Sequence, residues 1–131
     1  MKNRISFSTD LKNLSLAENF VELVSEKYEI SADVYGNIVL SVLEAVNNAI
    51  VHGNKMDFNK LIHLEADYEN STLTFVVTDE GEGFDYNNIP DPTSPENIEK
   101  INGRGIFLIR QLADTVQFEK GGTQLIISFN V

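Results

Sequence analysis

The sequence contains no cysteine, which excludes disulfide bonds and thiolate chemistry. It also has no uninterrupted apolar run that approaches the roughly 18 residues of a membrane-spanning helix. Its start, MKNRISFSTD, lacks the apolar core of a signal peptide. We therefore expect a cytoplasmic protein without a membrane segment.

Basic residues are scarce. Ten lysines and arginines stand against twenty acids, which gives a formal net charge of −10. This balance argues against direct binding of nucleic acid, because phosphate backbones require a basic face. A bound polyphosphate would need local help from backbone N–H groups, a metal ion or a well-placed arginine.

The length of 131 residues suits one domain, 1–131, and no internal repeat is present. Alternating and helical spacings of apolar residues predict the elements. The predicted strands and helices occupy separate stretches of the sequence. This arrangement predicts an α+β layer with helices on one face of a largely antiparallel sheet. The predicted elements are a strand at Arg4–Ser8, a helix at about Asn13–Lys27, a helix from a cap at Ser31 or Asp33 to about His52, strands around Ile62–Tyr68 and Leu73–Val77, a helix opening near Arg104, and strands at Thr115–Glu119 and Thr123–Val131.

Proline is confined to one segment. Pro90, Pro92 and Pro95 are the only prolines, and all lie within the poorly patterned stretch 85–102. A long irregular segment inside a compact domain is usually functional or mobile.

The second predicted helix carries an unusual polar stripe. At 100° per residue, Asn37, Ser41, Glu44, Asn48 and His52 fall on one side. A solvated helix face would account for this, but such faces usually carry lysine and arginine, and asparagine is a poor helix former. Glu44 could accept a proton from a hydroxyl group, and an amide oxygen such as that of Asn48 suits Mg²⁺. His52 could touch a phosphate, or it could be a cap or a packed residue.

A second motif follows the predicted strand that contains Val77. Asp79 continues the inward parity of that strand, and Gly81 and Gly83 follow it. A buried carboxylate needs hydrogen bonds, and a fixed acceptor of this kind suits an exocyclic amine such as that of adenine. The glycines would permit close approach by a flat ring. A tight turn in which Asp79 bonds its own backbone is the simpler alternative.

Two further motifs that contain glycine complete the set. Gly103 and Gly105 flank Arg104 near the start of a predicted helix, where free N–H groups and a permanent positive charge suit phosphates. Before the last predicted strand, Gly122 and Thr123 place a hydroxyl group on its inward face. Taken alone, this last motif is an ordinary hairpin turn.

The order of these motifs resembles the N, G1, G2 and G3 boxes of the GHKL ATPase superfamily. The matching pieces are Glu44-x-x-x-Asn48, Asp79-x-Gly81-x-Gly83, Gly103-x-Gly105 and Gly122-Thr123. The resemblance covers nearly the whole chain. The resemblance is greatest to the small anti-sigma factor serine kinases, whose N box is similar to residues 44–53 and whose G2 box is similar to Gly103-Arg104-Gly105-Ile106.

This resemblance implies a Bergerat-type sandwich, in which a mixed, mostly antiparallel sheet is covered on one face by helices. It implies ATP and Mg²⁺ between the long helix and a lid at about 85–102. By carry-over, Glu44 would be the general base, Asn48 would ligate Mg²⁺, and Asp79 would accept from the adenine amine. The remaining implied binding residues are Gly81, Gly83, Gly103, Arg104, Gly105 and Thr123.

The resemblance also implies partners. The phosphoryl acceptor would be a serine of an anti-anti-sigma (STAS-type) protein, a sigma factor would be sequestered, and the kinase would be a homodimer. Two alternatives stay open. One is a nucleotide-gated binding module without chemistry, and the other is a histidine-kinase-like ATPase domain. The second would need a phosphoryl acceptor in trans, because the only histidines are His52 and His63.

Overall fold

The computed structural model describes residues 3–83 and 101–131, with the side chains of residues 101–104 excluded. The proposed lid at about 85–102 lies outside the described residues, apart from its last two positions. The strands are β1 (Asn3–Ser8), β2 (Leu61–Glu69), β3 (Thr72–Thr78), β4 (Thr115–Glu119) and β5 (Gln124–Asn130). The main helices are α1 (Leu14–Lys27), α2 (Ala32–Asn48) and α3 (Ile101–Leu112).

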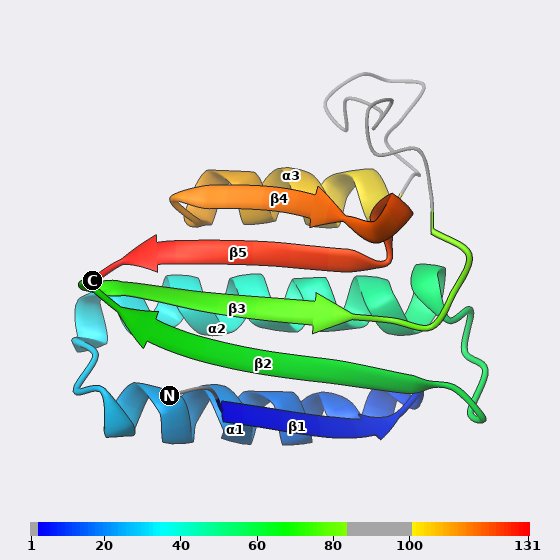
Figure 1. Cartoon of the computed structure of the whole chain (residues 1–131), viewed down its shortest axis with the longest axis horizontal. Helices are drawn as coiled ribbons and strands as arrows, with labels where there is room; N and C mark the ends of the chain where they lie inside the picture. The colour runs from blue at the N-terminus through cyan, green and yellow to red at the C-terminus, as the bar shows by residue number, and fades with distance from the viewer. Residues whose placement is uncertain (1–2, 84–100) are drawn as a thin grey trace.

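The five strands form one sheet in the order β1-β2-β3-β5-β4 (Figure 1). Every pairing among the described strands is antiparallel. The parallel pairing that a mixed sheet requires is therefore not found in this part of the chain. Apolar residues alternate along β3 as a strand requires. Leu73, Phe75 and Val77 are buried, and the residues between them are half-buried.

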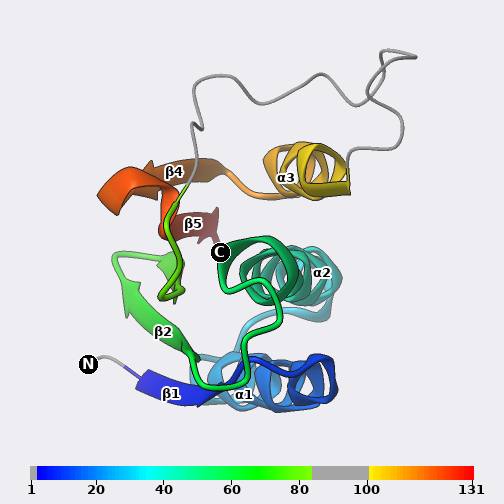
Figure 2. The same ribbon diagram turned by 90° about the vertical axis from the view of Figure 1, so that its right-hand side faces the viewer.

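All three helices cover the same face of the sheet (Figure 2). The predicted two-layer α+β fold is therefore confirmed. The middle helix, α2, contacts both α1 and α3. Its Ile38, Val42 and Val46 are fully buried and belong to one core cluster with sheet residues such as Phe75 and Leu64. The core is thus one apolar layer between sheet and helices.

The central helix begins at a side-chain cap. The Ser31 hydroxyl accepts a hydrogen bond from the Asp33 N–H at 3.1 Å, so Ser31 is the N-cap. At the other end, α2 continues into a π-helical turn, Ala49–Gly53. Together the two segments span 22 residues and contain an 18-residue window with a mean hydropathy of 1.4, enough by length and composition to cross a membrane. In this fold they form the central core helix.

The ends of several helices and strands meet at one edge of the molecule. The end of α2, the start of β2, the end of β3 and the starts of α3 and β5 all lie at the right-hand side of Figure 1. Helix α3 begins at Ile101, ahead of the predicted start near Arg104. This convergence brings the sequence motifs of the helix end, the β3 end and the β5 start into one region.

Candidate nucleotide site

A cavity of about 230 Å³ lies where these helix and strand ends converge. It contains three of the predicted site residues, Asn48, Asp79 and Gly83. Its full lining is Asn48, His52, Gly53, Lys55, Asp79, Gly83 and Gly122. The structure therefore joins the stripe on α2 to the motif after β3 and the turn before β5.

Two buried polar atoms face this region without a partner. Asn48 Oδ1 and His52 Nε2 have no hydrogen-bond partner within the described part of the chain. Burying a polar atom in this way is costly unless something pairs with it. Burial also lowers the pKa of His52, so its imidazole is neutral at pH 7. A polar ligand that supplies a cation or donor to Asn48 and a partner to His52 would satisfy both atoms.

Glu44 lies one turn before Asn48 and faces helix α3. A Cβ atom built on Gly105 would lie 3.3 Å from Glu44 Oε2. Gly105 therefore leaves room for the carboxylate at the contact between α2 and α3. Gly103 and Arg104 fall within the first turn of α3, and the position of the Arg104 side chain lies outside the described residues.

Asp79 is fixed directly after β3. Its backbone N–H donates to Thr123 O at 2.9 Å, and its Oδ1 accepts from the Gly81 N–H at 2.8 Å. Burial raises the pKa of this carboxyl group, against smaller opposing effects of the Gly81 N–H and the Lys60 charge. The local turn bond is therefore present, and the carboxyl group also lines the cavity.

Backbone crowding explains the glycines around Asp79. A Cβ atom on Gly81 would lie 2.0 Å from Gly53 O, and one on Gly53 would lie 2.3 Å from Asp79 Oδ2. At Gly83, φ is +82°, and a Cβ atom would lie 2.1 Å from Gly121 O. Only glycine fits these positions, because the obstructing atoms are mostly main-chain atoms that cannot rotate away.

Thr123 contacts the site through its main chain. Its carbonyl group holds the Asp79 N–H, while its hydroxyl group donates to Lys120 O at 2.9 Å. Thr123 does not line the cavity. The hydroxyl group is thus used within the turn that precedes β5.

Sequence reasoning missed three contributors. Lys55 and Gly53 line the cavity, and Asn54 is buried between them in sequence. A Gly-Asn pair after a helix is an ordinary termination signal, so nothing in the pattern marked Asn54. A buried asparagine bonded to residues far away in sequence can be recognised only from the fold.

The raised pKa of Asp79 leads to a prediction for Asp79→Asn. Burial raises the folded-state pKa of Asp79. Such a group lowers the free energy of unfolding of the protein as the pH rises from the unfolded-state pKa to the folded-state pKa of the group. We therefore expect Asp79→Asn to be more stable than the parent protein at pH 7. The gain should shrink as the pH is lowered to about 3, below the unfolded-state pKa of about 3.9, where Asp79 is largely protonated in both states. Thermal unfolding measured across this pH range would test it, and an equal gain at every pH would contradict the assignment.

Comparisons with known proteins agree with this architecture. The family model described as the histidine kinase-like ATPase domain matches residues 7–129. Serine-protein kinase RsbW of Bacillus cereus (strain AH820) is 29% identical over 114 residues, covering 81% of this chain and 71% of the relative. The RsbW protein of Bacillus thuringiensis (strain Al Hakam) matches at the same identity and coverage.

A solved structure has a similar fold. The crystal structure of the RsbU and RsbW domains of Rv1364c from Mycobacterium tuberculosis superposes with a TM-score of 0.69 over 98% of this chain. This chain spans 31% of that protein, and the sequence identity is 14%, so the likeness concerns the fold alone. The family model supports the resemblance to GHKL ATPases that the motifs indicate. The chain belongs to the histidine kinase-like ATPase domain family.

Proposed function

We propose that this protein is an ATP-dependent serine protein kinase that acts as an anti-sigma factor. It phosphorylates a serine of an anti-anti-sigma (STAS-type) partner and sequesters a sigma factor. The observation that carries the proposal is a pair of buried atoms, Asn48 Oδ1 and His52 Nε2, that have no hydrogen-bond partner among the described residues and whose residues line one cavity with Asp79. The names of the RsbW relatives support the reaction class.

The cavity residues divide the binding of Mg²⁺ and ATP among them. Asn48 offers an amide oxygen that suits Mg²⁺, which takes its other ligands from phosphates and water. Asp79 is the acceptor for the adenine amine, and Gly81 and Gly83 keep side chains away from the base. When bound, Mg·ATP supplies the phosphoryl group and neutralises charge during transfer.

The residues at the α2–α3 contact serve the chemistry. Glu44 accepts the proton of the attacking serine hydroxyl group. Gly103, Arg104 and Gly105 contact the phosphates through main-chain N–H groups and the arginine charge. Thr123 acts through Asp79, because its carbonyl group holds the Asp79 N–H.

The proposal includes the setting of the reaction. The chain forms a single ATP-binding domain over 1–131, with a lid at about 85–102, and works as a cytoplasmic homodimer. Its acidic character, a net charge of −10, supports protein partners over direct contact with nucleic acid.

Phosphotransfer to a purified STAS-type partner from the same cell tests the function. The full chain is incubated with that partner and Mg·ATP, and the phosphorylated residue is mapped by mass spectrometry. We expect one phosphoserine on the partner. Binding of ATP without phosphorylation of any partner would instead support a nucleotide-gated binding module, and a phosphohistidine would support a histidine-kinase-like role.

Asn48→Ala tests the metal role. We expect the variant to lose the increase in ATP affinity that Mg²⁺ gives the parent protein, a loss of about tenfold or more. Calorimetric titrations with and without Mg²⁺ measure this difference. Asn37→Ala, an exposed asparagine on the same helix, is the matched control. If Asn48→Ala kept the full Mg²⁺ effect, Asn48 would not be the metal ligand.

A further inference from the structure

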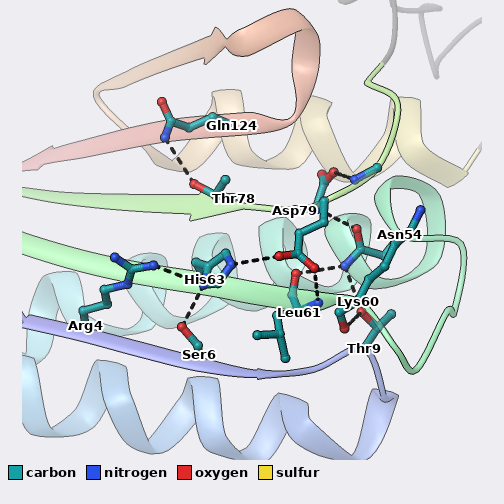
Figure 3. A network of polar contacts seen from close by, with 12 residues as sticks. Arg4, Ser6, Thr9, Asn54, Lys60, Leu61, His63, Thr78, Asp79 and Gln124 are labelled. Atoms are coloured by element: carbon teal, nitrogen blue, oxygen red, sulfur yellow. Dashed lines mark hydrogen bonds and ion pairs between the residues drawn. The ribbon is translucent and has the colours of Figure 1, made fainter.

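Three residues next to the cavity form a closed cycle of hydrogen bonds. Asn54 Nδ2 donates to Leu61 O at 3.0 Å. The Leu61 N–H donates to Glu80 Oε1 at 2.8 Å, and the Glu80 N–H donates to Asn54 Oδ1 at 2.7 Å. Each residue donates once and accepts once. The cycle connects the segment after α2, the start of β2 and the turn after β3 (Figure 3).

Asn54 is fully committed within this arrangement. It is 1% exposed, and its Nδ2 also donates to Thr9 Oγ1 at 2.8 Å. Its main-chain N–H donates to Ala49 O, and its carbonyl group accepts from the Asp57 N–H. A buried amide with all of its groups paired holds its neighbours in one geometry.

Glu80 closes the cycle from the surface. Its other carboxylate oxygen, Oε2, lies 3.4 Å from His63 Nε2. The Leu61 N–H, with a smaller contribution from His63, lowers the pKa of Glu80, so the accepting carboxylate persists at neutral pH. The acid that follows Asp79 in sequence therefore bonds to two residues of β2, Leu61 and His63. It is not among the residues that line the cavity.

Asp79 lies between two main-chain anchors. Its own N–H is held by Thr123 O, and the next N–H in the chain, that of Glu80, is held by Asn54. These bonds fix the peptide units on both sides of the Asp79 side chain. The first anchor comes from the turn before β5, and the second comes from the cycle.

We propose that Asn54 and Glu80 are positioning residues that set the orientation of the Asp79 carboxyl group and thereby the preference for adenine over guanine nucleotides. The inference rests on the proposed binding of ATP. An oriented carboxylate can accept from the exocyclic amine of adenine, whereas guanine carries a carbonyl oxygen at the same ring position. Loss of the orientation therefore lowers ATP affinity more than GTP affinity.

Calorimetric titrations of Glu80→Ala with Mg·ATP and Mg·GTP test the proposal. We expect about tenfold weaker ATP binding, a smaller loss for GTP, and hence a reduced ATP-to-GTP ratio of affinities. Glu80→Gln keeps an oxygen that accepts from the Leu61 N–H and should restore most of the ratio. Glu82→Ala removes a carboxylate from the same loop, where Glu82 makes no hydrogen bond to another described residue, and should leave the ratio unchanged.

Two further variants distinguish a positioning role from a general loss of structure. In an Asp79→Ala background, Glu80→Ala should no longer change the ratio, because the group that it orients is absent. Asn54→Asp keeps an acceptor for Glu80 but sets a carboxylate against Leu61 O, and it should lower the ratio as Glu80→Ala does.

The outcomes distinguish the inference from the function on which it rests. Equal weakening of both nucleotides by Glu80→Ala, or no change in a parent protein that prefers ATP, would overturn the positioning role alone. Failure of the parent protein to bind ATP would overturn the proposed function and this inference together.

Discussion

Replacing Glu44 with glutamine is expected to slow phosphotransfer to serine by about 100- to 10,000-fold, the usual contribution of a general base. The dissociation constant for Mg·ATP should change little. Glutamine preserves the size of the side chain that faces Gly105, where the space beside α3 is limited. It removes only the ability to take a proton.

Single-turnover assays with a saturating partner would measure this rate, and calorimetry would measure ATP affinity. Glu69→Gln is a matched control, because Glu69 is an exposed acid at the end of β2 away from the cavity. If Glu44→Gln transferred phosphate at the parental rate, Glu44 would not be the base. Equal losses of rate and of ATP affinity would indicate a binding role instead.

Gly81→Ala should lower the free energy of unfolding by about 3 kcal/mol and prevent nucleotide binding. The added methyl group would lie 2.0 Å from Gly53 O, and overpacking of this kind typically costs about 1–3 kcal/mol. Because the obstructing atom belongs to the main chain, we expect the upper end of that range. The melting temperature should fall by roughly 10 °C.

Gly36→Ala supplies the opposite result in the same assay. Gly36 lies within α2, and a Cβ atom built on it has nothing within 4 Å. Alanine there should stabilise the protein by about 0.5–1 kcal/mol, because glycine is the poorer helix former. If Gly81→Ala were as stable as the parent protein, the tight contact between the Asp79 turn and Gly53 would be wrong.

Local patterns predicted most of the fold. The strand Thr115–Glu119 coincides with β4, and the Ser31 cap was one of two residues expected. The start of α3 was placed too late, because Gly103 and Gly105 resemble a loop when read without their neighbours. The antiparallel pairing throughout the described sheet also could not be fixed locally, since strand order depends on contacts between distant segments.

The candidate site was predictable to a lesser degree. Asn48 stood out because it is a poor helix former on a polar helix stripe that lacks lysine and arginine. Asp79 stood out because it continues the inward parity of its strand. The physical reason for the glycines at 81 and 83 was not predictable, because the atoms that exclude a side chain belong to Gly53 and Gly121. Asn54 gave no signal at all, since its partners are Thr9, Leu61 and Glu80.

The strand order has a consequence for biosynthesis. β5 comes last among the described strands, yet it lies between β3 and β4 in the sheet. The carbonyl group that holds the Asp79 N–H belongs to Thr123, directly before β5. A ribosome-bound chain that has exposed everything up to α3 therefore still lacks one anchor of its cavity. We therefore expect nucleotide binding to begin only after β5 has emerged and entered the sheet, so that ATP would not stabilise the partly synthesised domain.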